Sequence, residues 1–237
     1  MSESPEFLSR TTFHKRSSIL YALLCFYFLV FGAEIARAGS DNFLSFGLAG
    51  GSVIAPNTEL ESSPALGDAD FDSGYSFKAS LGILLAQKIQ LEAEYLYTFN
   101  DINAIINPPT VTELVASDRV THSLMLNATY RIEVPPHGDT FWMRRGYYVY
   151  FGGGVGVSRQ DYTVETLASE SDSSLAWQLM VGFEKMHTSP SMFTAFPSPF
   201  LQYRFMNITE GDFGAFKTDA TLHLIEFGFR FYGGLGS

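Results

Sequence analysis

The sequence predicts an all-β fold, an eight-stranded antiparallel up-and-down transmembrane β-barrel preceded by a cleavable signal peptide. The N-terminus has the pattern of an export signal, about eight later segments alternate apolar and polar residues, and polar turn-rich segments separate them. Of the 237 residues, 46% are hydrophobic and 15% are aromatic, and the formal net charge is −10. This composition excludes a disordered chain. The acidity argues against a general affinity for nucleic acid.

Residues 1–38 have the three parts of a signal peptide. A basic start is followed by the apolar run from Ile19 to Phe31 and by Ala36-Arg37-Ala38, a small-x-small cleavage site. We expect cleavage after Ala38 and a barrel domain over residues 39–237. The apolar run is shorter than the roughly 20 residues of a membrane-spanning helix, and an uncleaved N-terminal anchor is the alternative. Because the only cysteine, Cys25, lies in this leader, the mature chain is expected to contain no disulfide and no thiolate metal site.

After the leader, the strand-type segments share a period of two residues and a length close to or above the 9–11 residues that cross a bilayer at a tilt. The predicted strands are residues 42–54, 75–85, 88–99, 119–133, 145–160, 174–185, 198–208 and 220–232. Long connections are expected at residues 55–74, 100–118, 161–173 and 209–219. The opposite side would hold a tight turn at Ala86-Gln87 and the connections 135–144 and 186–197. Longer loops outside and shorter turns inside are typical of outer-membrane barrels.

The two faces of each predicted strand differ in bulk and charge. In residues 88–99, Leu91, Tyr95 and Tyr97 lie on one face, while Glu92 and Glu94 lie on the other. Bulky rings from all eight strands would overfill so narrow a bore. The apolar face is therefore predicted to point outward into lipid. A soluble lipid-binding barrel, the alternative, requires the reverse arrangement.

The segment "YYVYFGGGVGVSRQDYTV" superficially resembles a phosphate-binding loop. It lacks the Lys-Ser/Thr pair and the following helix that such a loop needs. Gly152, Gly154 and Gly156 instead fall at every second position, with Phe151 and Val155 between them, which is the period of a strand. We expect the glycines to face the lumen and leave room for long side chains from other strands.

Charged residues of both signs fall on the predicted inner faces. Lys78 and Glu94 are equidistant from Ala86 and are expected to be cross-strand partners, and Arg204 and Glu226 are related similarly about the last loop. A buried charge is tolerated only when it is paired. A solvated open sheet face and a catalytic carboxylate cluster are the alternatives. The predicted lumenal charge network comprises Lys78, Glu92, Glu94, Arg131, Glu133, Glu184, Arg204, Glu226 and Arg230.

Three stretches give the chain a resemblance to a known family. They are "GYSFKASLGILLAQKIQLEAEYLYTFNDI" (residues 74–102), "GYYVYFGGGVGV" (residues 146–157) and "IEFGFRF" (residues 225–231). With its exported start, the chain resembles the opacity-type outer-membrane β-barrel family, small porin-like barrels that include bacterial surface antigens. The resemblance implies an eight-stranded barrel delivered by the outer-membrane assembly machinery. It also implies that Phe227, Phe229 and Phe231 in the last strand form the assembly signal.

Residues with catalytic potential do not converge in the predicted barrel. His122 and Ser123 are adjacent strand residues on opposite faces, as are His223 and Glu226 by parity. The five histidines have no metal-ligand spacing. We therefore expect no enzyme, no catalytic or metal site and no cofactor.

The functional expectation is an exported protein of the bacterial outer membrane with a structural, surface-antigen or adhesion role carried by its extracellular loops. The expected partners are outer-membrane lipid, the outer-membrane assembly machinery and host or cell-surface ligands, without nucleic acid. A narrow passive porin, a soluble lipid-binding barrel and an outer-membrane lipid-modifying enzyme are the alternatives.

Overall fold

The computed structural model describes residues 43–56, 58–60, 67–107, 110–112, 117–136, 146–164, 170–185, 197–212 and 217–234. The predicted signal peptide, its cleavage site and the start of the predicted barrel domain lie outside these residues. No helix in the described part of the chain is long and apolar enough to cross a membrane.

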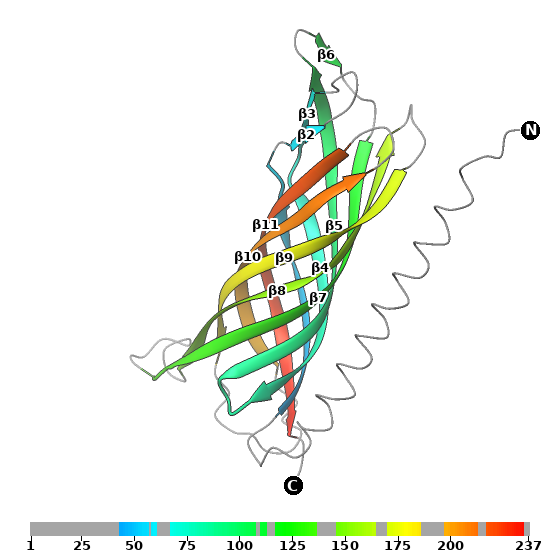
Figure 1. Ribbon diagram of the computed structural model, residues 1–237. Coiled ribbons are helices and arrows are strands. Elements are labelled where there is room, and N and C mark those ends of the chain that lie inside the picture. The colour runs from blue at the N-terminus through cyan, green and yellow to red at the C-terminus, as the bar shows by residue number, and fades with distance from the viewer. Residues whose placement is uncertain are drawn as a thin grey trace, which may run out of the picture.

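Eight long antiparallel strands close into a barrel (Figure 1). Each pairs with its neighbours in the chain, and the first pairs with the last, so the ring has no free edge. The barrel strands are β1 (Phe43–Ile54), β4 (Gly74–Leu85), β5 (Ile89–Asn107), β7 (Ser117–Val134), β8 (Tyr147–Val164), β9 (Glu170–Lys185), β10 (Ser198–Asp212) and β11 (Lys217–Gly234). The predicted all-β barrel and its strand order are confirmed.

Three short strands prolong the wall at one end of the barrel, and we call this the extension end (Figure 1). They are β2 (Thr58–Leu60), β3 (Gly67–Phe71) and β6 (Thr110–Thr112). β3 pairs with the last part of β5, where Asp68 lies opposite Ile106, and β6 pairs with the same part of β5. Long loops were expected at residues 55–74 and 100–118, and this expectation was wrong in part. Because β5 continues past the rim, it offers unpaired backbone groups with which these segments form hydrogen bonds.

The opposite end, which we call the turn end, contains the tight turn between β4 and β5. The backbone N–H of Lys88 donates to the carbonyl oxygen of Leu85 at 3.0 Å. Ala86 and Gln87 both have positive φ, at 48° and 59°. Positive φ at both central residues is the requirement of a type I′ hairpin turn, whose twist matches that of the strands. The predicted turn at these two residues is confirmed.

The register of two hairpins differs from the sequence expectation. Glu94 lies opposite Ser80, and Lys78 lies opposite Leu96, because the register is centred on Gln87 and not on Ala86. Glu226 likewise lies opposite Gln202 and not opposite Arg204. Each predicted pair is therefore diagonal and not directly opposed. A shift of two residues keeps both members of a pair on the same face.

Candidate functional site

Polar and charged side chains fill the turn-end half of the lumen, where strand alternation points every second residue inward. Arg204 is fully buried and lies between two carboxylates. Its Nε donates to Oε2 of Glu226 at 3.0 Å, and its Nη2 donates to Oε2 of Glu94 at 2.9 Å. Lys78 Nζ lies 3.3 Å from Oε2 of Glu94. Two of the predicted partner pairs therefore meet in one cluster.

A second cluster is centred on Glu184. Its carboxylate contacts Arg230, and its Oε1 lies 2.8 Å from Nη2 of Arg131. The Tyr232 hydroxyl donates to Oε1 of the same carboxylate at 2.6 Å. Arg230 Nη2 lies 3.2 Å from Oε2 of Glu92. Glu184 thus binds two guanidinium groups and one hydroxyl from two other strands, β7 and β11.

Together these clusters form what we call the observed charge network. Its members, all buried, are Lys78, Glu92, Glu94, Arg131, Glu184, Arg204, Glu226 and Arg230. Four cations face four carboxylates, so the network carries no net formal charge. Mutual pairing offsets the cost of removing each charge from water.

Glu133 was predicted to belong to the network, and this prediction was wrong. Its side chain is exposed, although it shares the inward parity of Arg131. Glu133 is the residue before the last one of β7, and it lies opposite Tyr148, the second residue of β8. Parity sets the direction of a side chain, but the wall does not enclose a residue at its rim.

Sequence reasoning missed four neutral residues that add hydrogen bonds to the two clusters. Gln202 Nε2 donates to Glu226 at 3.0 Å, and Gln178 Nε2 donates to Oε1 of Glu94 at 3.3 Å. Tyr150 donates its hydroxyl to Gln202 Oε1 at 3.0 Å, and Tyr232 bonds Glu184. Parity was the available signal, because Tyr150 shares the face of Gly152 and Gly154. Which neutral groups satisfy which charges depends on strand tilt around the ring, and the sequence does not contain that tilt.

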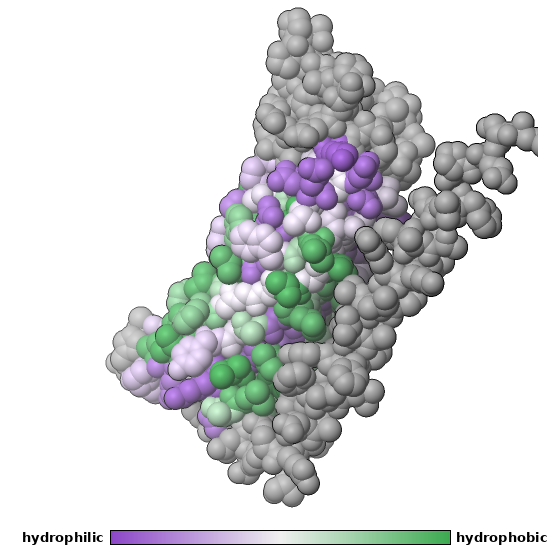
Figure 2. Space-filling view, viewed as in Figure 1, coloured by the Kyte–Doolittle hydropathy of each residue, from purple (hydrophilic) through white to green (hydrophobic). Residues whose placement is uncertain are grey.

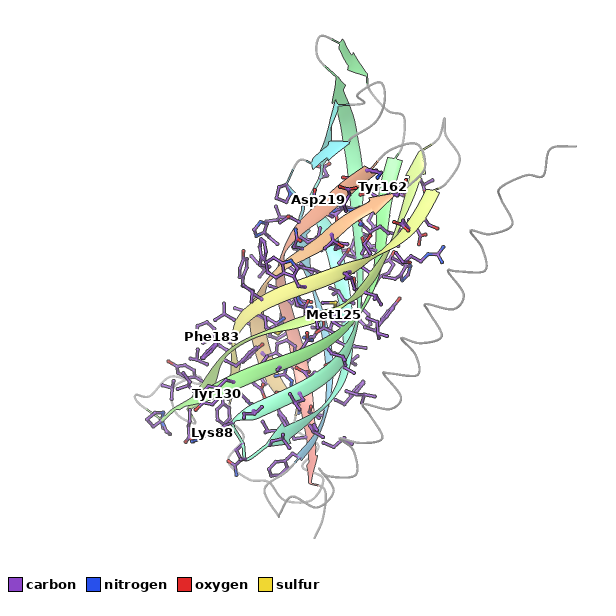
Figure 3. The ribbon with its side chains drawn as sticks, viewed as in Figure 1. Lys88, Met125, Tyr130, Tyr162, Phe183 and Asp219 are labelled. Atoms are coloured by element: carbon purple, nitrogen blue, oxygen red, sulfur yellow. The ribbon has the colours of Figure 1, made fainter. Side chains whose placement is uncertain are left out.

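The lumen changes character along the barrel axis. Along β5 from the turn end, the inward residues are Gln90, Glu92, Glu94, Leu96, Thr98 and Asn100, all buried. An apolar layer therefore follows the charges, and a polar layer follows that. The apolar layer contains Val53, Leu96, Met125, Met206, Ile208, Leu222 and Leu224. Figure 3 places Met125 between Lys88 at the turn end and Asp219 toward the extension end.

Glycines on β8 allow the wall to close tightly around this filling. A Cβ at Gly156 would lie 2.1 Å from the carbonyl oxygen of Leu124, and one at Gly154 would lie 1.9 Å from Oδ1 of Asn127. Their register partners, Met125 and Asn127, are buried inward-facing residues. The glycines thus lie on the lumenal face, as the sequence predicted.

The candidate catalytic pairs are separated by the wall. Ser123 is buried and its Oγ lies 2.6 Å from Oγ of Ser158, whereas His122 contacts the exposed Tyr95. His223 contacts the exposed Tyr203 on the outside, and Glu226 is buried in the lumen. The two residues of each pair therefore cannot act on the same substrate group. Within the described ranges, no three His, Cys, Asp or Glu side chains are grouped as metal ligands would be.

The outside of the barrel is an apolar belt. Figure 2 shows apolar side chains over the middle of the wall and a hydrophilic zone toward the extension end. Leu81, Val155 and Leu175 are 58%, 64% and 65% exposed. Aromatic pairs lie toward both ends, such as Tyr75 with Phe99 at 5.2 Å between ring centroids and Tyr147 with Phe183 at 6.2 Å. A continuous apolar exterior around a charged interior requires hydrocarbon as its solvent.

The chain folds as an outer-membrane-type β-barrel.

No family model matches the chain, and no curated protein is similar to it at the level of sequence. Solved structures similar to this barrel include Neisserial surface protein A (NspA), with 15% identity, a TM-score of 0.48, and coverage of 79% of this chain and 95% of that one. Another is Ail, the attachment invasion locus protein of Yersinia pestis, in complex with the heparin analogue sucrose octasulfate. It has 11% identity, a TM-score of 0.40, and coverage of 79% and 99%. OprG from Pseudomonas aeruginosa has 19% identity, a TM-score of 0.43, and coverage of 82% and 97%.

Proposed function

We propose that this protein is an integral outer-membrane barrel whose role is exerted at its extension end, as a surface antigen or adhesion-type protein or as a structural element of the envelope. The observation that carries the proposal is the continuation of the wall beyond the length that a membrane needs. β5 contains 19 residues. At about 3.3 Å per residue and a tilt near 45°, such a strand rises roughly 44 Å, compared with about 30 Å of hydrocarbon.

The remainder of β5 supports further strands and not a simple loop. Its last residues pair with β3 on one side and β6 on the other, and β2 pairs with β3. A small sheet standing above the rim presents a fixed surface, which suits recognition better than a free loop does because less conformational entropy is lost on binding.

Filling of the lumen argues against the alternative of a narrow passive porin. The charge network is neutral, and Leu96, Met125, Met206 and Leu224 are fully buried beside it. A soluble lipid-binding barrel requires an apolar cavity and a polar exterior, the reverse of the observed polarity.

Assembly is part of the proposal. Phe227, Phe229 and Phe231 project outward from β11 and are 51%, 41% and 37% exposed. They would be accessible to the outer-membrane assembly machinery while the last strand is being paired, in agreement with the signal that the family resemblance implies.

The test is an accessibility experiment on intact cells. A short epitope tag is inserted after Thr112, at the extension end, and in a matched variant after Pro136, at the other end of β7. We expect antibody and protease to reach only the first tag in intact cells and both tags in lysed cells. Both proteins should migrate faster in detergent gels before boiling than after it. Exposure of the Pro136 tag alone, or mobility unchanged by boiling, would overturn the proposal.

A second experiment separates the two roles at the extension end. The segment that contains β2 and β3, residues 58–71, is replaced by a short Gly-Ser linker, and heat-modifiable migration verifies that the barrel still folds. Reduced adherence of cells to coated surfaces would favour adhesion. Unchanged adherence with increased sensitivity to detergent would favour the envelope role, and no change in either would contradict a function at this end.

A further inference from the structure

In the described part of the barrel, His122 and His223 lie on the exterior in the same local arrangement. On β5 and β7, the hydroxyl of Tyr95 lies 2.7 Å from Nδ1 of His122, and the ring of Tyr97 meets the imidazole edge-on at 5.4 Å. On β10 and β11, Tyr203 lies 2.7 Å from Nδ1 of His223, and Phe205 meets that ring at 5.4 Å. In both cases the tyrosine hydroxyl is hydrogen-bonded to Nδ1, so that Nε2 is the ring nitrogen that can bind a ligand.

The next strand distinguishes the two arrangements. His122 lies directly opposite Arg159 of β8, whereas His223 lies directly opposite Ile54 of β1. Opposed residues on one face have Cβ atoms about 4.5–5.5 Å apart. The imidazole of His122 and the guanidinium of Arg159 can therefore contact a single group, whereas His223 has the apolar Ile54 at the corresponding position.

Arg159 is held in place and still accessible. Its side chain is 60% exposed. Its Nε donates to Oδ1 of Asp161 and its Nη2 donates to Oγ of Ser171, each at 3.1 Å. The adjacent Asp161 partly offsets the positive charge, but these two contacts fix the plane of the guanidinium. A guanidinium group with a fixed plane is a common hydrogen-bond donor to phosphate groups.

The depth of this surface identifies the kind of ligand. On the turn-end side, the next outward-facing pair is Leu124 with Val157, and Val155 follows opposite Leu126. Leu124 and Val155 are exposed parts of the apolar belt. On the extension-end side, the next outward-facing pair is Val120 with Asp161, and Asp118 follows opposite Thr163. His122 and Arg159 therefore lie at the outer edge of the belt, where the headgroups of the adjacent leaflet begin.

We propose that His122 and Arg159, with the hydroxyl of Tyr95, form a binding site for the phosphate of a lipid in the leaflet at the extension end. The inference rests on the membrane placement in the proposed function. The acyl chains would lie along the apolar belt below, and the phosphate would accept hydrogen bonds from the guanidinium and the imidazole. An anion site of this kind fixes the depth and rotation of the barrel in the bilayer.

The test measures lipid retention by purified, folded protein in detergent, using native mass spectrometry. The probe is dioleoyl phosphatidic acid, a lipid phosphate monoester, and the reference lipid is dioleoylglycerol, which has the same chains without the phosphate. We expect the protein to retain phosphatidic acid in preference to dioleoylglycerol. Arg159→Gln should weaken retention about tenfold, the equivalent of one charge-assisted hydrogen bond. His122→Gln should weaken it in the same direction.

The second histidine supplies matched controls. His223→Gln should leave retention unchanged, and Ile54→Arg should raise the number of tightly retained lipids by one, because it places an arginine opposite His223. Heat-modifiable migration verifies the folding of every variant. Equal retention by Arg159→Gln and the unaltered protein would overturn the proposal, as would equal losses in His122→Gln and His223→Gln. Because the experiment uses purified protein in detergent, its outcomes do not depend on where the protein is located in the cell. A failure of the lipid site can therefore be distinguished from a failure of the proposed function.

Discussion

At the scale of single residues, the barrel depends on buried charges that are paired with one another. Arg204 contacts Glu94 and Glu226 and has no exposed surface. Gln178 and Gln202 occupy further hydrogen-bonding positions of the same carboxylates. Glu94 is contacted from three other strands, by Lys78, Gln178 and Arg204. The removal of a cation from this cluster leaves its partners buried and uncompensated.

Arg204→Gln is therefore expected to lower the free energy of unfolding by about 3–5 kcal/mol, since Glu94 and Glu226 lose their shared cation. Urea unfolding of the protein in detergent micelles measures this change. Lys217→Gln is the matched control, because Lys217 is 50% exposed and lies 3.7 Å from Glu210 at the rim. Its loss should cost less than about 1 kcal/mol. Similar costs for the two variants would show that the lumen is well hydrated and would contradict the buried network.

At the scale of elements, the β4–β5 turn determines which charges meet. Ala86 and Gln87 occupy left-handed conformations that side chains with a Cβ adopt at a cost of about 1–2 kcal/mol each. The register that results places Ser80 opposite Glu94, so that Ser80 donates to Glu92 at 2.8 Å and Lys78 reaches Glu94 diagonally. Local strain at the turn is thus compensated by pairing along the whole hairpin.

Replacing Ala86-Gln87 by Asn-Gly is expected to raise the free energy of unfolding by about 1 kcal/mol, because Asn and Gly adopt positive φ at lower cost. The same urea titration measures it. Lys88→Gly is the control, since Lys88 belongs to the turn but does not have a positive φ. This substitution should not raise the free energy of unfolding. A loss of stability in the Asn-Gly variant would mean that the turn is not of the I′ type.

At the scale of the whole molecule, the barrel has its apolar side outside and its charged side inside. Ser123 and Leu124 are consecutive, yet Ser123 is 2% exposed in the lumen and Leu124 is 40% exposed on the belt. Labels at these two adjacent positions should therefore lie in opposite environments, the lumen and the lipid.

A fluorescent label at Leu124→Cys, in a Cys25→Ser background, is expected to be strongly quenched by nitroxide groups on lipid acyl chains. A label at Ser123→Cys should be quenched several-fold less, because the wall separates the lumen from lipid. Steady-state fluorescence in reconstituted vesicles gives both values. Stronger quenching at position 123 than at position 124 would mean that the polar face contacts lipid. This result would contradict the proposed function.

The strand number, the closure and the direction of each face were predictable, because a period of two and the volume of an eight-stranded bore are properties of the chain alone. Parity also placed Lys78, Glu94, Arg204 and Glu226 on one face, although each pair proved to be diagonal. The extension of β5 with β2, β3 and β6 was not predictable, since short polar segments become strands only when an edge is available to pair with them.

By itself, therefore, the sequence determined the all-β barrel, its polarity and the set of side chains that face inward. The tertiary structure alone decided which of those side chains meet, that Glu133 lies outside the rim, and that His122 acquires Arg159 as a neighbour while His223 acquires Ile54. The physical reason is that alternation is local to each strand, whereas register and tilt arise only when eight strands must close one ring with all their backbone groups paired.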